Sequence, residues 1–157
     1  MLKKLITILL IFILMTGCKQ ETMDQEEKNE YLAYKSDLVD RTEFSENDDL
    51  PCDITISIDR VNDESVSYTT VISNPKENMN NIKMMIVHNY FTEEVFPTVG
   101  VFDKGRSLTV SDTSNITLVG YIDTTKDIKK LDLELKIWIE YKTEDGEVKD
   151  IYYKTTK

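Results

Sequence analysis

An alternation of apolar and polar residues between Leu131 and Tyr141 constrains this chain more than any other part of its sequence. Every second position of that segment is a large apolar residue, and charged residues fill most of the positions between them. Successive side chains of a β-strand point to opposite faces, so this period of two predicts a strand with one buried face. Trp138 is the exception, because it shares a face with the charged residues.

Further strands are predicted from residue 53 onward. Ile54, Ile56 and Ile58 alternate with polar residues, which is typical of a strand with one buried face. The segment 82–91 is more continuously apolar and predicts a strand that is buried on both faces. The other expected strands are residues 66–72, 108–110, 116–122 and 148–153.

Turn signals separate these segments and point to the fold class. Asn-Asp-Glu at 62–64 predicts one hairpin turn, Pro75 ends a strand, and Asp145-Gly146 predicts a second, tight hairpin. Many antiparallel strands without alternating helices predict a mainly β chain folded as an antiparallel β-sandwich. We expect an immunoglobulin-like topology, but the Cys–Trp–Cys pattern of antibody domains is absent.

The first residues differ from the rest of the chain. Lys3 and Lys4 give a short positive start, and an uncharged, almost wholly apolar stretch runs from Leu5 to Met15. This stretch is too short to span a bilayer, which takes about 20 apolar residues as a helix. Its length and flanks are those of the hydrophobic region of a secretory signal peptide.

The segment 14–18, Leu-Met-Thr-Gly-Cys, resembles the lipobox of bacterial lipoproteins. In that class the cysteine sulfur receives a diacylglyceryl group, and the leader is cut just before it. The third position before the cysteine is usually leucine and is Met15 here, which is apolar and of similar volume. The resemblance covers the leader alone. It implies a signal peptide at 1–17, lipidation at Cys18, and anchoring to the outer face of the cytoplasmic membrane. The expected architecture and short tether suit a Gram-positive type of envelope, while the leader alone is also compatible with a Gram-negative one.

The net charge of −10 becomes more negative once the two leader lysines are removed. Nucleic-acid binding is therefore not expected, because phosphates require a basic surface. Anionic lipid head groups would repel the domain, so we expect it to stand off the membrane. If Cys18 carries lipid, Cys52 has no partner for a disulfide, and we expect it to be a small, inert residue at the start of a strand.

Three units are expected after the leader. Residues 18–30 are polar and acidic, which predicts a lipidated, flexible tether. Residues 31–50 are expected to form a short helix followed by an acidic loop, because Tyr31, Tyr34 and Leu38 recur at helical spacing. Residues 51–157 are the expected β-sandwich domain.

No catalytic site, metal site or cofactor is predicted. The single histidine, His88, has no nucleophile motif near it, so we expect a half-buried side chain with a local hydrogen bond. His88 and Cys52 cannot supply a four-ligand zinc site. Calcium is a weaker alternative without an EF-hand pattern. Its possible ligands are Glu46, Asp48, Asp49, Asp53, Asp59 and Asp63.

One segment is a candidate for contact with a partner. Its members are Phe91, Glu93, Glu94, Phe96 and Phe102. The phenylalanines either pack into the core or form an exposed apolar patch, which usually marks a contact surface.

Three kinds of function stay open from the sequence. The leading hypothesis is a non-catalytic module that binds an envelope protein or a wall component. The alternatives are an enzyme that acts on envelope carbohydrate or peptide through carboxylates, and an ion-binding accessory protein. The sequence does not define an oligomeric state.

Overall fold

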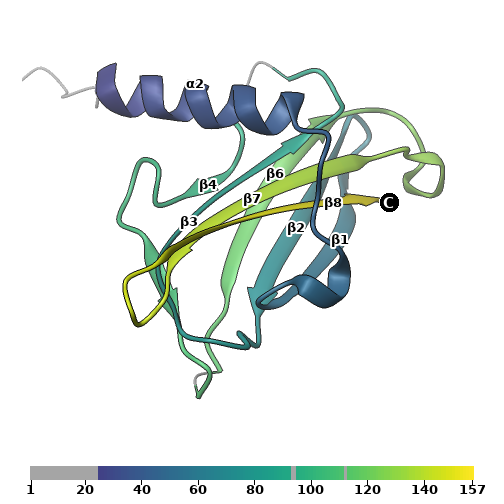
Figure 1. Ribbon diagram of the computed structural model, residues 1–157. Coiled ribbons are helices and arrows are strands. Elements are labelled where there is room, and N and C mark those ends of the chain that lie inside the picture. Colours follow the sequence, from purple (N-terminus) through teal and green to yellow (C-terminus); the bar gives the residue numbers. More distant parts are fainter. Residues whose placement is uncertain (1–24, 93–94, 112) are drawn as a thin grey trace, which may run out of the picture.

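Two antiparallel β-sheets and one long helix make up the described part of the chain (Figure 1). The computed structural model describes residues 25–92, 95–111 and 113–157. The strands are β1 (Asp53–Asn62), β2 (Ser65–Ser73), β3 (Met79–His88), β4 (Thr98–Val99), β5 (Arg106–Leu108), β6 (Ile116–Asp123), β7 (Glu134–Lys142) and β8 (Val148–Thr156). The helices are α2 (Gln25–Asp40) and two short 3-10 helices, η1 (Asn47–Asp49) and η2 (Ile128–Lys130).

The strand order is that of an immunoglobulin-like sandwich. One sheet has the order β1-β2-β6, and the other has the order β4-β3-β7-β8, with β5 also pairing with β3. Strands β1, β2 and β6 thus occupy the positions of immunoglobulin strands A, B and E, and β3, β7 and β8 occupy those of C, F and G. The predicted antiparallel β-sandwich is confirmed. Among the described residues, no strand fills the position of strand D beside β6.

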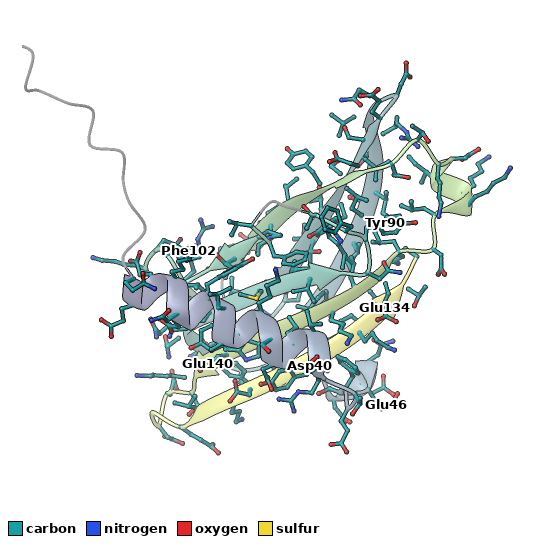
Figure 2. The ribbon with its side chains drawn as sticks, turned by 90° about the horizontal axis from the view of Figure 1, so that it is seen from above. Asp40, Glu46, Tyr90, Phe102, Glu134 and Glu140 are labelled. Atoms are coloured by element: carbon teal, nitrogen blue, oxygen red, sulfur yellow. The ribbon has the colours of Figure 1, made fainter. Side chains whose placement is uncertain are left out.

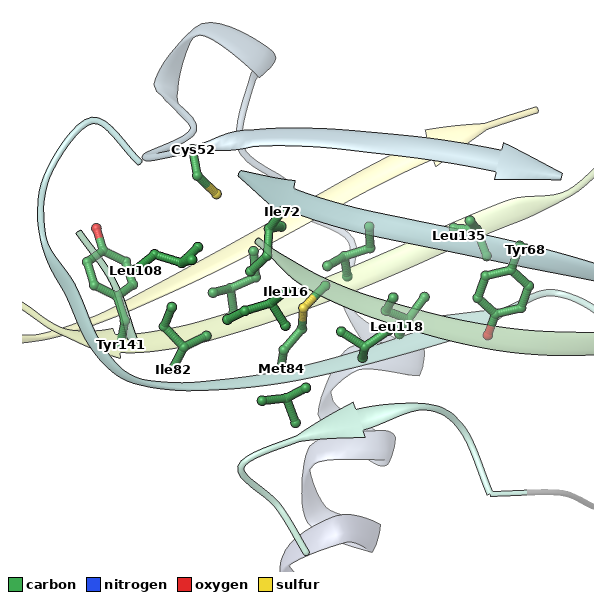
Figure 3. Close-up of a cluster of buried hydrophobic side chains, with 14 of the residues drawn as sticks. Cys52, Tyr68, Ile72, Ile82, Met84, Leu108, Ile116, Leu118, Leu135 and Tyr141 are labelled. Atoms are coloured by element: carbon green, nitrogen blue, oxygen red, sulfur yellow. The ribbon is translucent and has the colours of Figure 1, made fainter. Parts of the chain in front are cut away.

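The core between the sheets is built from the alternating positions. Every second residue of β2 and β6 is buried, and the register sets Val66 opposite Ile122. Met84 and Ile86 of β3 and Leu135 of β7 pack against them from the other sheet (Figure 3). Removing these apolar side chains from water is the force that holds the two sheets face to face.

The strand expected from residue 131 begins later in the structure. β7 starts at Glu134, because η2 precedes it and Leu131 and Leu133 then run through the core outside the strand. Leu133 still exchanges two backbone hydrogen bonds with Lys157, at 3.1 and 2.9 Å. The hairpin predicted after β7 is confirmed, and Gly146 has the positive φ of 83° that glycine adopts without strain.

β3 is buried on both faces, as its continuous apolar run predicts. Met84 faces the core between the sheets, and its neighbours Met85 and Val87 face the helix. The strand ends at His88 and not at residue 91, because the side chain of Asn89 bonds the backbone of another segment.

The short strand expected at 108–110 lies at 106–108 and pairs with the start of β3. The backbone N–H of Val110 donates to the side chain of Asn78 at 3.0 Å. The side chain of Asn78 therefore accepts the hydrogen bond that Val110 would have donated to a neighbouring strand if β5 continued to residue 110.

The helix begins at Gln25, so the prediction of a flexible tether is wrong for residues 25–30. Glu30 binds Lys83 of β3 at 2.7 Å and accepts a hydrogen bond from Tyr34 at 2.9 Å. Glu26 and Glu27 in the first turn also favour the helix through its dipole. The predicted leader, Cys18 and the tether up to residue 24 lie outside the described residues.

Helix α2 packs on the outer face of the sheet that contains β3 and β7 (Figure 2). Tyr34 stacks on Trp138 with a centroid distance of 4.0 Å, and Tyr31 and Leu38 are buried. This contact explains why Trp138 interrupts the charged face of β7, since the helix covers it there. The indole N–H of Trp138 donates to Asp150 at 2.8 Å, so its polar atom is also satisfied.

Cys52 is buried at the edge of the core just before β1. Burial raises the pKa of its thiol to about 11. The thiol is therefore protonated at neutral pH and packs as a small apolar group, as the sequence predicts.

Replacement of Leu135 tests the assignment of the core. Leu135→Ala is expected to lower the free energy of unfolding by about 2–5 kcal/mol, because this side chain is fully buried. Denaturant unfolding measures the change, and Val148→Ala at a half-exposed position of β8 is the control. A loss below about 1 kcal/mol for Leu135→Ala would contradict the assignment.

Candidate interaction surface

The structure separates the predicted contact residues into two groups. Phe91 is 84% exposed, whereas Phe96 is 7% exposed and Phe102 is half-buried. Glu93 and Glu94 lie outside the described residues. Phe96 and Phe102 thus pack inward, whereas Phe91 alone of the three phenylalanines points into solvent.

Phe96 and Phe102 fasten the segment to α2. The backbone N–H of Phe96 donates to the hydroxyl of Tyr31 at 3.0 Å. The ring of Phe102 lies against the ring of Tyr31, with centroids 5.4 Å apart. The ammonium group of Lys35 lies 5.2 Å from the centre of the Phe96 ring. These contacts hold the segment against one side of the helix.

Both ends of the loop that carries Phe91 are fixed by hydrogen bonds. At its start, the amide of Asn89 donates to the Asp132 carbonyl and accepts from the Glu134 N–H, each at 3.0 Å. At its end, the Ile86 N–H donates to the Pro97 carbonyl at 3.2 Å. The described residues at each end are thus held while Phe91 is left exposed.

The loop lies away from the start of the helix. Figure 2 shows Phe102 near the first turns of α2 and Tyr90 toward the opposite end of the molecule. Phe91 follows Tyr90 directly in the chain.

His88 lies at the base of this loop. Its ring makes edge-on contacts with Phe96 and Tyr68, with centroids 5.0 and 5.6 Å apart. The N–H of Tyr90 donates to Nδ1 of His88 at 3.2 Å. The predicted half-buried histidine with a local hydrogen bond is confirmed, and burial lowers its pKa.

A small pocket of about 170 Å³ opens beside His88. Its lining combines Val39 and Val87 with the polar groups of Asn89, Glu134 and Lys136. Lys136 also donates to backbone carbonyls at the end of α2, so this lysine joins the helix to the sheet below it.

A second pocket, of about 420 Å³, lies between residues 48–51 and the strands. Glu77 at this pocket accepts hydrogen bonds from the Tyr141 hydroxyl at 2.6 Å and from Lys149 at 2.9 Å. The bond from Tyr141, with that from Lys149, lowers the pKa of Glu77. A carboxyl that acts as a general acid needs a raised pKa, which is the opposite shift.

The acidic residues considered for calcium do not converge. Asp53 and Asp63 lie at opposite ends of β1, which is about 30 Å long for a strand of its length. Among the residues that the structure describes, no three histidine, cysteine, aspartate or glutamate side chains are placed to hold a metal ion.

No protein-family model matches the chain, and no curated protein matches its sequence. Within residues 25–92, 95–111 and 113–157, no helix is long and apolar enough to cross a membrane.

Protonation of His88 should make the stability of the protein depend on pH. The folded pKa lies below the unfolded value of 6.5, so the unfolded chain takes up the proton first as pH falls. The free energy of unfolding is expected to have its highest value above the unfolded pKa. It should then decrease as the pH falls from the unfolded pKa to the folded pKa.

This chain contains no other histidine, so the effect can be assigned to one group. Denaturant unfolding of the wild type and of His88→Gln from about pH 7.5 to about pH 5.5 measures it. The variant should show a flatter profile than the wild type, and equal slopes would contradict the prediction.

Proposed function

We propose that this chain is a lipid-anchored cell-surface lipoprotein that binds a protein or wall component of the envelope without catalysis. The observation that carries the binding role is Phe91, an exposed phenyl group on a loop whose ends are hydrogen-bonded in place. Burying such a ring in a partner contributes about 1.5–3 kcal/mol. The ends of this loop, at Asn89 and Pro97, are already held, so their ordering costs no further entropy when a partner binds.

The leader supports the anchoring role. A positive start, an apolar stretch and Cys18 after two small residues are the features of a lipoprotein signal. One acyl chain binds a membrane only weakly, but two or more chains on one residue anchor it stably. The lipid would thus restrict the domain to the membrane surface.

The position of the helix start determines which end of the domain the proposed anchor holds near the membrane. Only residues 18–24 separate Cys18 from Gln25, and an extended chain of that length reaches about 25 Å at most. The domain is therefore held near the membrane by the end at which α2 begins. Tyr90 lies toward the other end, so the loop with Phe91 is available to a partner in the envelope.

The net charge of −10 restricts the kinds of partner that this surface can bind. A phosphate-rich polymer would be repelled by this surface, whereas a neutral or basic protein surface would not. The favoured partner is therefore an envelope protein with an apolar pocket for Phe91.

Replacement of the lipidated residue tests the anchor. The mature wild type is expected to begin at Cys18, carry added acyl mass and sediment with membranes, whereas Cys18→Ala should carry no lipid. Intact-mass measurement and membrane fractionation of bacteria that express each form check this. An unmodified wild type that is cut elsewhere and released would contradict the anchor.

A photo-crosslinking amino acid at position 91 tests the binding surface. In intact cells it is expected to form one adduct of defined mass, while the same group at the half-exposed control position 148 should not. Phe91→Ala, co-expressed in excess, should compete less well for the adduct than the wild type does. Equal labelling at positions 91 and 148 would remove the basis for the proposal.

A further inference from the structure

Strand β6 is an edge strand of eight residues. It pairs with β2 along its length, from Ile116 opposite Ile72 to Asp123 opposite Ser65. No second strand among the described residues lies beside it, because β5 pairs with β3 instead. The position that strand D takes in immunoglobulin domains is thus open along β6.

The backbone groups on the open side of β6 can be identified from the ladder. Thr124 donates its N–H to the carbonyl of Glu64 at 2.7 Å, so these two residues form a hydrogen-bonded pair. Such pairs alternate with non-bonded pairs along an antiparallel ladder. The residues whose N–H and C=O groups point away from β2 are therefore Thr117, Val119, Tyr121 and Asp123.

The other long edges of the sandwich carry protection that β6 lacks. In β1 the register shifts between Arg60 and Asn62, and a shift of this kind hinders strand addition. In β8 the carbonyl of Tyr152 is taken by the N–H of Ser45 at 2.7 Å, and Lys149 and Lys154 add charge. The register of β6 is continuous, and the strand contains no lysine, arginine or proline.

The side chains on the open face of β6 favour pairing. Val119 and Tyr121 are 43% and 51% exposed, although both are large apolar residues on a sheet surface. Asp123, at the end of the strand, is its one charged residue. A charged peptide would find little complementary charge here, so the strand best suits a partner strand of its own neutral character.

We propose that β6 pairs antiparallel with β6 of a second copy of this chain, about a two-fold axis at Gly120. This dimer contact goes beyond the partner binding assigned to Phe91 and involves a different surface. The two three-stranded sheets would become one continuous six-stranded sheet. An isologous contact of this kind closes after two copies and does not propagate.

The register about Gly120 satisfies each outward position. Val119 of one copy lies opposite Tyr121 of the other, an aromatic and β-branched pair that stabilises antiparallel strands. Asp123 lies opposite Thr117, so no two acids face each other. In this register, every residue of β6 whose backbone N–H and C=O groups point away from β2 therefore lies opposite a residue of the same kind in the other copy.

Gly120 also suits the centre of this contact. A Cβ atom at this position would lie 2.2 Å from the Tyr68 hydroxyl, so the Tyr68 ring takes the space that a side chain would need. The two glycines would face each other across the axis without steric conflict. Shifting the register by two residues in one direction would place Val119 opposite itself and leave Asp123 without a partner on the other β6. Shifting it in the other direction would place Tyr121 opposite itself and leave Thr117 without one.

Cysteine crosslinking of the full chain tests both the contact and its register. Hydrogen-bonded antiparallel pairs have Cα atoms about 5.5 Å apart, which suits a disulfide. Co-expressed Val119→Cys and Tyr121→Cys chains are expected to give a covalent heterodimer on mild oxidation. Val119→Cys alone should not crosslink, because its two copies are out of register, and neither should Val61→Cys, a matched exposed valine on β1.

Sedimentation of the full chain in detergent tests the dimer without a crosslink. Val119→Lys is expected to raise the dimer dissociation constant about tenfold through loss of both valine–tyrosine pairs, and Val61→Lys should leave it unchanged. Circular dichroism verifies that each variant is folded. A monomeric wild type at all concentrations, or equal crosslinking of the Val119, Tyr121 and Val61 cysteines, would overturn the proposal. Neither outcome would affect the proposed role of Phe91, whose crosslink is measured at another surface.

Discussion

Packing of α2 on the outer face of β3 and β7 is the contact on which much of this structure depends. The stacking of Tyr34 on Trp138 lies at its centre, and Tyr31 and Leu38 are buried on either side of it along the helix. A sheet that is apolar on both faces needs a cover on each, and the helix supplies the second one. The same helix positions the interaction segment, because Tyr31 contacts both Phe96 and Phe102.

The ion pairs around the helix have a smaller role than the apolar packing. Lys83 and Glu30 are both partly exposed, and pairs of this kind contribute at most about 1 kcal/mol. Their value lies in geometry, since Lys83 also contacts the hydroxyl of Tyr34 at 3.3 Å. The contact fixes where the first turns of the helix lie against β3, while the buried rings provide most of the stabilisation.

The sequence was sufficient to predict the sandwich and a short helix after residue 31, but not where that helix starts or which sheet it covers. Alternating isoleucines in β1, the apolar run of β3 and the Asp145-Gly146 hairpin are local patterns, and each is found where it was predicted. The helix start was missed because residues 25–30 are polar, and the lysine that binds Glu30 lies far away in the chain. Trp138 was the available signal for a cover on that face. Which phenylalanine is exposed could not be predicted, because the partner of Phe96 is Tyr31, another distant residue.

The contacts of α2 also bear on the order in which the protein can form during synthesis. The helix is the first described element of the chain, yet its partners β3 and β7 come much later. Arg41, directly after the helix, lies 3.6 Å from the ring centre of Tyr152 in the last strand. The helix therefore stays unsupported until β3 and β7 have emerged, and folding that joins such distant segments is slow. For the export that we propose for this chain, such a delay is an advantage, because the native state cannot form before β3 and β7 are both available.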